Sequence, residues 1–197
     1  MTPAETTPDD CISLRLMHPA RHRALRELAA FARQMADHWT ALAGRFDGPA
    51  ARALSDGAAT AGTVLAAVRR LASARGLEIG PAALSAGRVA RARPAIPDAL
   101  LERNQALRFA LLDAEHLVIL VEYVGALSAS EGDEELATAC AGWKTALGKP
   151  QRAARRAALA LAATPDVAVE PLSKGQRLSY ALGWLGEATD RRHRSRG

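Results

Sequence analysis

The chain has few of the residues on which disulfide-rich or β-sheet proteins depend. Its 197 residues include only two cysteines, Cys11 and Cys140, so we expect neither a disulfide framework nor a CxxC metal site. Aromatic residues make up 4% of the chain, and Ala and Leu dominate, which favours helix over sheet. The N-terminal residues contain acids and no apolar run of signal-peptide length, so we predict a cytoplasmic location.

Long apolar runs and catalytic motifs are also lacking. The most apolar stretch, residues 107–127, is interrupted by Asp113, Glu115, His116 and Glu122, which excludes a membrane span of about 20 uncharged residues. No glycine-rich phosphate loop and no GxSxG motif occur. We therefore expect no membrane partner, no cofactor and no catalytic residues, which argues against an enzyme.

The net charge of +5 is concentrated at one end of the chain. Lys and Arg number 26 and Asp and Glu 21, but four arginines lie in residues 191–197, which leaves 22 basic against 21 acidic residues elsewhere. A nucleic-acid interface would have to use the arginines of the tail and of residues 88–93. These are Arg88, Arg91, Arg93, Arg191, Arg192, Arg194 and Arg196. No aromatic residue is interleaved with them for base stacking, so nucleic acid is an unfavoured partner.

Apolar periodicity predicts an all-α fold with four long helices at about 18–44, 49–76, 97–130 and 133–163. Residues 1–17 are expected to form a flexible arm, 164–190 a loop and a short fifth helix, and 191–197 a basic tail. The first helix carries the most regular apolar line, at steps of three and four. Its members are Leu25, Leu28, Ala32, Met35, Trp39, Leu42 and Phe46. A similar line on the second helix passes through Leu54, Ala58, Ala61, Leu65, Val68 and Ala72.

The connections between these helices predict the topology of a bundle. The short turn near Asp47, Gly48 and Pro49 predicts an antiparallel hairpin. Residues 77–96 hold no sustained period, and 20 extended residues reach about 66 Å, more than the roughly 40 Å length of the second helix. This segment can therefore cross the whole bundle before the second hairpin begins.

The second hairpin is predicted from 97 to 163. Two apolar lines on the third helix indicate neighbours on two sides. One passes through Leu107, Leu111, Ala114, Val118, Val121 and Gly125, and the other through Ala110, Leu117, Leu120, Val124 and Leu127. Asp133 is expected to cap the fourth helix, with Glu134 and Glu135 in its first turn, in preference to forming a cation site. The apolar line of the fourth helix passes through Pro150, which predicts a kinked but continuous helix, with a break near Gly148 as the alternative.

The fifth helix is predicted to be wide and apolar, with Tyr180, Trp184 and Leu185 as interaction residues. A terminal helix of this kind has to pack on the bundle or on another subunit. We therefore expect self-association or a protein partner.

The predicted topology, two hairpins joined by a long crossover, resembles that of the ferritin-like superfamily. The local sequence VEYVGALSASEGDEELATACAGW resembles in particular that of rubrerythrin-type bundles. The resemblance covers residues 18–163 and implies a di-metal centre held by two Glu and two Glu-x-x-His pairs. This sequence contains no Glu-x-x-His, and its second and fourth helices carry no acid or His over 58–76 and 136–163. We expect the ligand layer to be filled by Trp39, Val64, Val118 and Trp143.

Three functional hypotheses follow. The favoured one is a ferritin-like bundle without a catalytic metal centre, acting as a structural or protein-binding module. The second is a degenerate metal or redox protein, whose weak candidate ligands are Asp113, His116, Asp37 and His38. The third is a nucleic-acid-associated bundle that uses the arginines named above.

Overall fold

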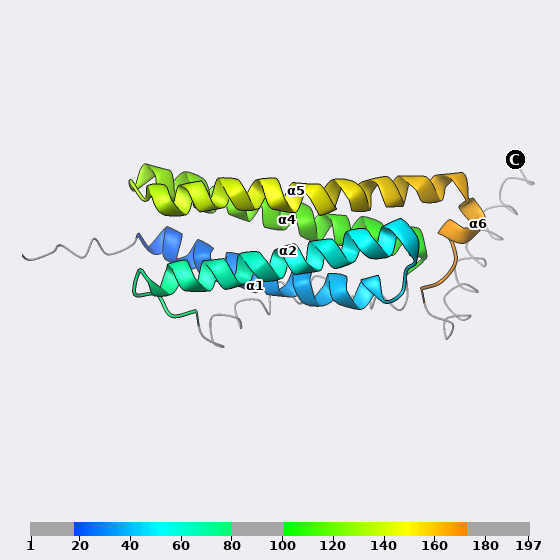
Figure 1. The fold of residues 1–197 in the computed structure, drawn as a ribbon, viewed down its shortest axis with the longest axis horizontal. Helices are drawn as coiled ribbons and strands as arrows, with labels where there is room; N and C mark the ends of the chain where they lie inside the picture. Colours follow the sequence, from blue (N-terminus) through cyan, green and yellow to red (C-terminus); the bar gives the residue numbers. More distant parts are fainter. Residues whose placement is uncertain (1–17, 80–100, 173–197) are drawn as a thin grey trace, which may run out of the picture.

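The computed structural model describes residues 18–79 and 101–172. Over these ranges the protein is an all-α bundle, drawn in Figure 1. Its long helices are α1 (Pro19–Ala43), α2 (Gly48–Ser73), α4 (Arg103–Ser130) and α5 (Glu134–Ala160). A short 3-10 turn (Leu161–Ala163) and the one-turn helix α6 (Pro165–Ala168) follow. The predicted all-α bundle is confirmed, whereas the predicted fifth helix at 173–190 lies outside the described residues.

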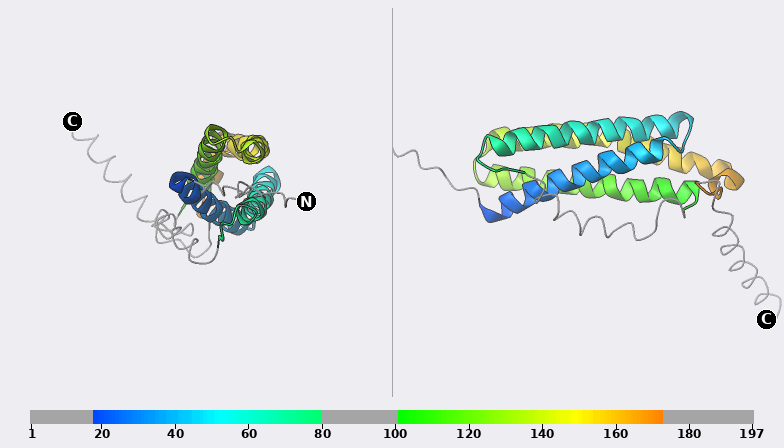
Figure 2. Two further views of the ribbon diagram at one scale, coloured as in Figure 1. Left: turned by 90° about the vertical axis from the view of Figure 1, so that its left-hand side faces the viewer. Right: turned by 90° about the horizontal axis from the view of Figure 1, so that it is seen from below.

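Each long helix packs against two neighbours. The helices α1 and α2 form one hairpin and α4 and α5 the other, while α2 also contacts α5 and α1 also contacts α4. The end-on view in Figure 2 shows the hairpin of α4 and α5 above that of α1 and α2. None of the described helices is both long and apolar enough to cross a membrane.

The end of α2 and the beginning of α4 lie at opposite ends of the bundle (Figure 1). Arg75, just after α2, binds Asp133 in the turn between α4 and α5. At the other end Arg103, the first residue of α4, lies over the ring of Phe46, which precedes α2, at 5.1 Å. This placement is the one that a crossover requires, although the path from 80 to 100 lies outside the described residues.

The predicted start of the third helix at 97 is wrong, because α4 begins at Arg103. The backbone before it is engaged elsewhere: Leu172 N donates to Leu101 O at 3.1 Å and Arg103 N donates to Glu170 O at 2.9 Å. Glu102 then starts the helix by a capping box with Gln105, whose side chain accepts from Glu102 N at 3.2 Å. Residues 101–102 therefore pair with the segment after α6 and leave the helix to begin later.

The predicted apolar line of α1 is confirmed, since all seven of its members are buried. On α2, Val64 is buried in place of Leu65, which is only partly buried. On α4 the two predicted lines were wrong in detail, because one buried line takes members from both. It consists of Leu107, Ala110, Ala114, Leu117, Val121, Val124 and Ser128. Leu111, Val118 and Leu127 lie at its edges.

Trp39 of α1 lies about one turn before the end of its helix and is the largest of the fully buried side chains. Its side chain is fully buried, and its Nε1–H donates to the backbone carbonyl of Ala110 on α4 at 3.2 Å. The ring lies against Gly57 of α2 so closely that a Cβ there would be 2.2 Å from two ring carbons. Pro150 Cβ of α5 lies 3.4 Å from the same Cβ position. Helix α5 continues through Pro150, as predicted.

We expect the substitution Gly57→Ala to destabilise the protein, because the added methyl group overlaps the Trp39 ring. Overpacking of a core costs about 1–3 kcal/mol, which outweighs the gain of up to about 1 kcal/mol in helix propensity. Urea denaturation followed by circular dichroism measures the free energy of unfolding. The control is Gly62→Ala in the same helix, where nothing lies within 4 Å and stability should be unchanged or higher. Equal stability of the two variants would contradict this account of the core.

Candidate functional site

Two of the candidate ligands meet between α1 and α4. His38 Nδ1 lies 2.7 Å from Asp113 Oδ2, and their side chains are 18% and 14% exposed. The pair therefore forms a partly buried polar contact between the hairpins. His116 lies one turn further along α4, and its ring centroid is 4.2 Å from that of Phe31 on α1.

Asp37 does not join this pair. Its side chain is 73% exposed and its carboxylate lies 3.6 Å from Arg33 on the same helix. Within residues 18–79 and 101–172, no group of three or more His, Cys, Asp and Glu residues could hold a metal ion. The geometry suits a hydrogen-bonded pair that links two helices.

The expected layer of apolar residues in place of metal ligands is correct for only two members. Trp39 and Val64 are buried, but Val118 and Trp143 are only partly buried. The buried line of α4 passes through Ala114, Leu117 and Val121, so Val118 falls at its edge.

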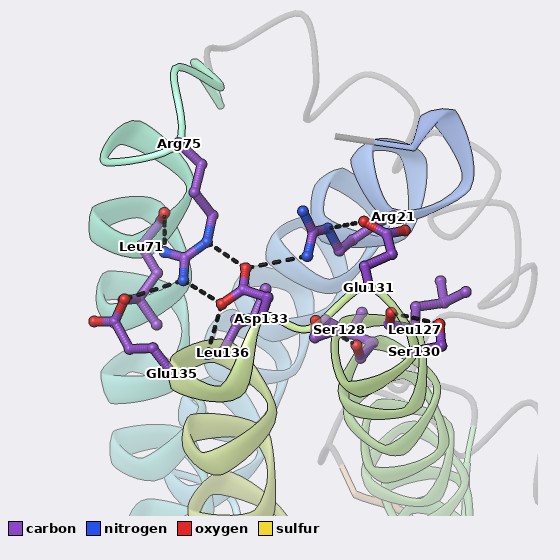
Figure 3. Close-up of polar contacts among 11 residues, drawn as sticks. Arg21, Leu71, Arg75, Leu127, Ser128, Ser130, Glu131, Asp133, Glu135 and Leu136 are labelled. Atoms are coloured by element: carbon purple, nitrogen blue, oxygen red, sulfur yellow. Dashed lines mark hydrogen bonds and ion pairs between the residues drawn. The ribbon is translucent and has the colours of Figure 1, made fainter. Parts of the chain in front are cut away.

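A cluster of ion pairs closes one end of the bundle (Figure 3). Asp133 lies at its centre, in the turn between α4 and α5. Arg75 binds it with two hydrogen bonds, from Nε to Oδ2 at 2.7 Å and from Nη2 to Oδ1 at 2.6 Å. Arg21 Nη1 adds a third at 3.1 Å, and Glu131 and Glu135 bind Arg21 and Arg75 at 3.1 and 3.0 Å. We call these five residues the end cluster.

The end cluster joins α1 and α2 to the turn of the other hairpin. Asp133 also caps α5 as predicted, since its Oδ1 accepts from Leu136 N at 3.1 Å. The hydrogen bonds from Arg75 hold the pKa of Asp133 below its usual value, although burial opposes the shift. The same bonds raise the pKa of Arg75. Every charge here is paired by another side chain, which indicates a structural role.

Sequence reasoning missed both arginines of the end cluster. One signal was present for Arg21, which lies one step of four residues before Leu25 and so extends the buried line of α1. It is 7% exposed. A basic residue in register with a buried line needs an acidic partner, because an unpaired buried charge is costly.

A line of large apolar residues on α4 faces outward. Its members, which we call the α4 stripe, are Phe109, Leu112, Ile119 and Tyr123, and they are 46%, 51%, 52% and 50% exposed. Sequence reasoning did not single them out, because the apolar residues of this helix are spread around most of its circumference. Arg108, Glu115 and Glu122, each one position before a residue of this line or before His116, are exposed as well.

The buried cysteine is poorly suited to nucleophilic chemistry. Cys140 is 2% exposed, and its Cβ lies 3.0 Å from the position that a Cβ would take at Gly125 of α4. Burial, with a smaller effect from Asp133, raises the pKa of the thiol to about 12. The thiolate is therefore almost absent near neutral pH, and Cys140 acts as a small core residue.

The remaining predicted site residues lie outside the described residues. They are Tyr180, Trp184, Leu185, Arg88, Arg91, Arg93, Arg191, Arg192, Arg194 and Arg196. Comparison with known proteins finds no matching family model, curated protein or solved structure. The resemblance to ferritin-like proteins thus stays a prediction.

We expect Asp133→Asn to lower the free energy of unfolding by about 1–3 kcal/mol at pH 7, because charged hydrogen bonds to Arg21 and Arg75 are weakened. The pKa of Asp133 is lowered by folding, so its stabilisation is present above the ordinary carboxyl pKa of about 4 and is lost as the pH falls through the lower folded value. The difference between the wild-type protein and the variant should therefore shrink below about pH 4.

The matched control is Asp37→Asn, which removes an exposed pair and should change stability by less than about 0.5 kcal/mol. Chemical denaturation at a series of pH values measures both variants. A difference for Asp133→Asn that is independent of pH down to about 2 would show that its carboxylate is not held in this way.

Proposed function

We propose that this protein is a divergent ferritin-like bundle without a catalytic metal centre, and that it acts as a protein-binding module through the α4 stripe. Its support begins with the core. The Trp39 indole is fully buried, packs against Gly57 of α2 and donates a hydrogen bond to Ala110 O of α4. With the core packed in this way, we expect the functional surface on the outside of the bundle.

The observation that carries the proposal is the exposure of the α4 stripe. Four large apolar side chains, two of them aromatic, are each about half exposed along one helix. Scattered apolar residues are ordinary on a protein surface, but a contiguous line that includes aromatic residues is typical of interaction sites. Acidic and basic residues flank the stripe, at Arg108, Glu115 and Glu122, as polar rims flank the apolar centre of an interface.

The test is a photo-crosslinking amino acid placed at Leu112 in the full chain expressed in cells. We expect covalent adducts with a polypeptide that mass spectrometry can identify, because Leu112 is an inner member of the stripe and is 51% exposed. The control position is Leu159, which is 66% exposed but belongs to α5 and not to the stripe, and it should give few adducts. Absence of adducts at Leu112, or equal adducts at both positions, would refute a protein-binding role for the stripe.

A second candidate, a degenerate metal-binding protein, rests on the 2.7 Å contact between His38 and Asp113 with His116 one turn away. The proposed function predicts less than about 0.1 equivalent of iron, manganese or zinc in protein purified without chelator. Elemental analysis of the wild-type protein and of Asp113→Asn decides between the two. Stoichiometric metal that is lost in Asp113→Asn would favour the second candidate.

A further inference from the structure

The spacing of the α4 stripe is that of a coiled-coil contact. Phe109, Leu112, His116, Ile119 and Tyr123 follow one another at steps of three, four, three and four residues. His116 is the partly buried member, with its ring against Phe31, and the other four are about half exposed. A line with this period matches the surface of another helix laid along it.

Charges at the two ends of the stripe favour one orientation of that helix. Arg108 precedes Phe109 at one end, and Glu122 precedes Tyr123 at the other. Both are exposed, and Glu122 also pairs with Lys144 on α5. Two copies of α4 laid antiparallel bring Arg108 of each copy near the Glu122–Tyr123 end of the other. A parallel arrangement in register would not bring Arg108 of one copy near Glu122 of the other. The antiparallel arrangement gives two such attractive contacts, against one repulsive contact between the Glu115 side chains of the two copies.

The apolar residues of the stripe are also arranged nearly symmetrically about a midpoint close to Glu115 and His116. In the antiparallel arrangement Leu112 lies opposite Ile119 of the second copy, and Phe109 and Tyr123 close the two ends. The two-fold axis then passes beside Glu115 and His116. A single helix surface thus supplies both halves of an isologous contact, the commonest interface of homodimers.

From this complementarity, and resting on the proposed protein-binding role of the stripe, we infer that the partner of the α4 stripe is a second copy of this chain, packed antiparallel along α4. The interface is small. With roughly 150–250 Å² for an aromatic side chain, the exposed halves of four large residues amount to about 400 Å² per copy, and a standard interface needs about 800 Å². The flanking residues have to contribute, and we expect a dissociation constant in the micromolar range.

Sedimentation velocity of the full chain over concentrations from about 1 to 200 μM tests the inference. We expect a reversible monomer–dimer equilibrium. Leu112→Glu should weaken the dimer at least about a hundredfold, because it places a charge opposite the apolar Ile119 of the other copy, twice in each dimer. Leu159→Glu introduces the same charge at an exposed position of α5 and should leave the equilibrium unchanged. Circular dichroism confirms that both variants remain folded.

A charge exchange tests the orientation. Arg108→Glu alone should weaken the dimer about tenfold, because two attractive contacts become repulsive. The double variant Arg108→Glu with Glu122→Arg should restore most of the affinity. A dimer that Arg108→Glu does not weaken, or that the double variant does not restore, would contradict the antiparallel contact and overturn the inference.

A protein that stays monomeric at every concentration, or a dimer that is insensitive to Leu112→Glu, would also overturn the inference. The crosslinking experiment at Leu112 decides the proposed function independently of this result. Crosslinked adducts at Leu112 that contain a different polypeptide would retain a protein-binding role and exclude the second copy as the partner. Adducts that contain only this chain would agree with the inference.

Discussion

The bundle depends on the packing of one indole ring into a gap that has no side chain. Trp39 is the largest fully buried residue in a core composed mostly of Ala, Leu and Val, and it contacts the backbone of α2 at Gly57. Its N–H is satisfied by Ala110 O of α4, so a polar atom is buried without loss of its hydrogen bond. The same ring therefore links α1 both to α2, its partner in the hairpin, and to α4 of the other hairpin. Pro150 lies beside the same glycine and brings α5 into this contact.

The end cluster complements this apolar centre with directional contacts. Tightly packed helices of Ala and Leu can slide along one another with little change in buried area, whereas a bidentate Arg–carboxylate pair accepts only a narrow geometry. Asp133 receives Arg75 and Arg21 while it caps α5, so it fixes the register of three helices at once. The charge of the cluster is nearly balanced, which lets the arginines lie partly buried.

Much of the fold could be predicted from the sequence, because apolar period and capping are local properties. The line from Leu25 to Phe46, the cap at Asp133 and the continuity of α5 through Pro150 all followed from neighbours within a few turns. The start of α4 could not be predicted, since it depends on backbone pairing of Leu101 and Glu102 with residues near 171. The α4 stripe was missed for a related reason. A helix that is apolar on most sides does not reveal which side its neighbours cover.

The separation of the contacts along the chain has a consequence for the order of assembly. Asp133 reaches Leu136 within a single turn, whereas Arg75 and Arg21 are 58 and 112 residues away in sequence. The entropic cost of closing a loop grows with that separation. The contact that caps α5 therefore costs less to form than the contacts of Asp133 with the two arginines. The contacts within each hairpin carry the smaller closure cost, and those between the two hairpins carry the larger one. Arg21 and Arg75 thus bind a carboxylate whose position is already fixed by the cap of α5.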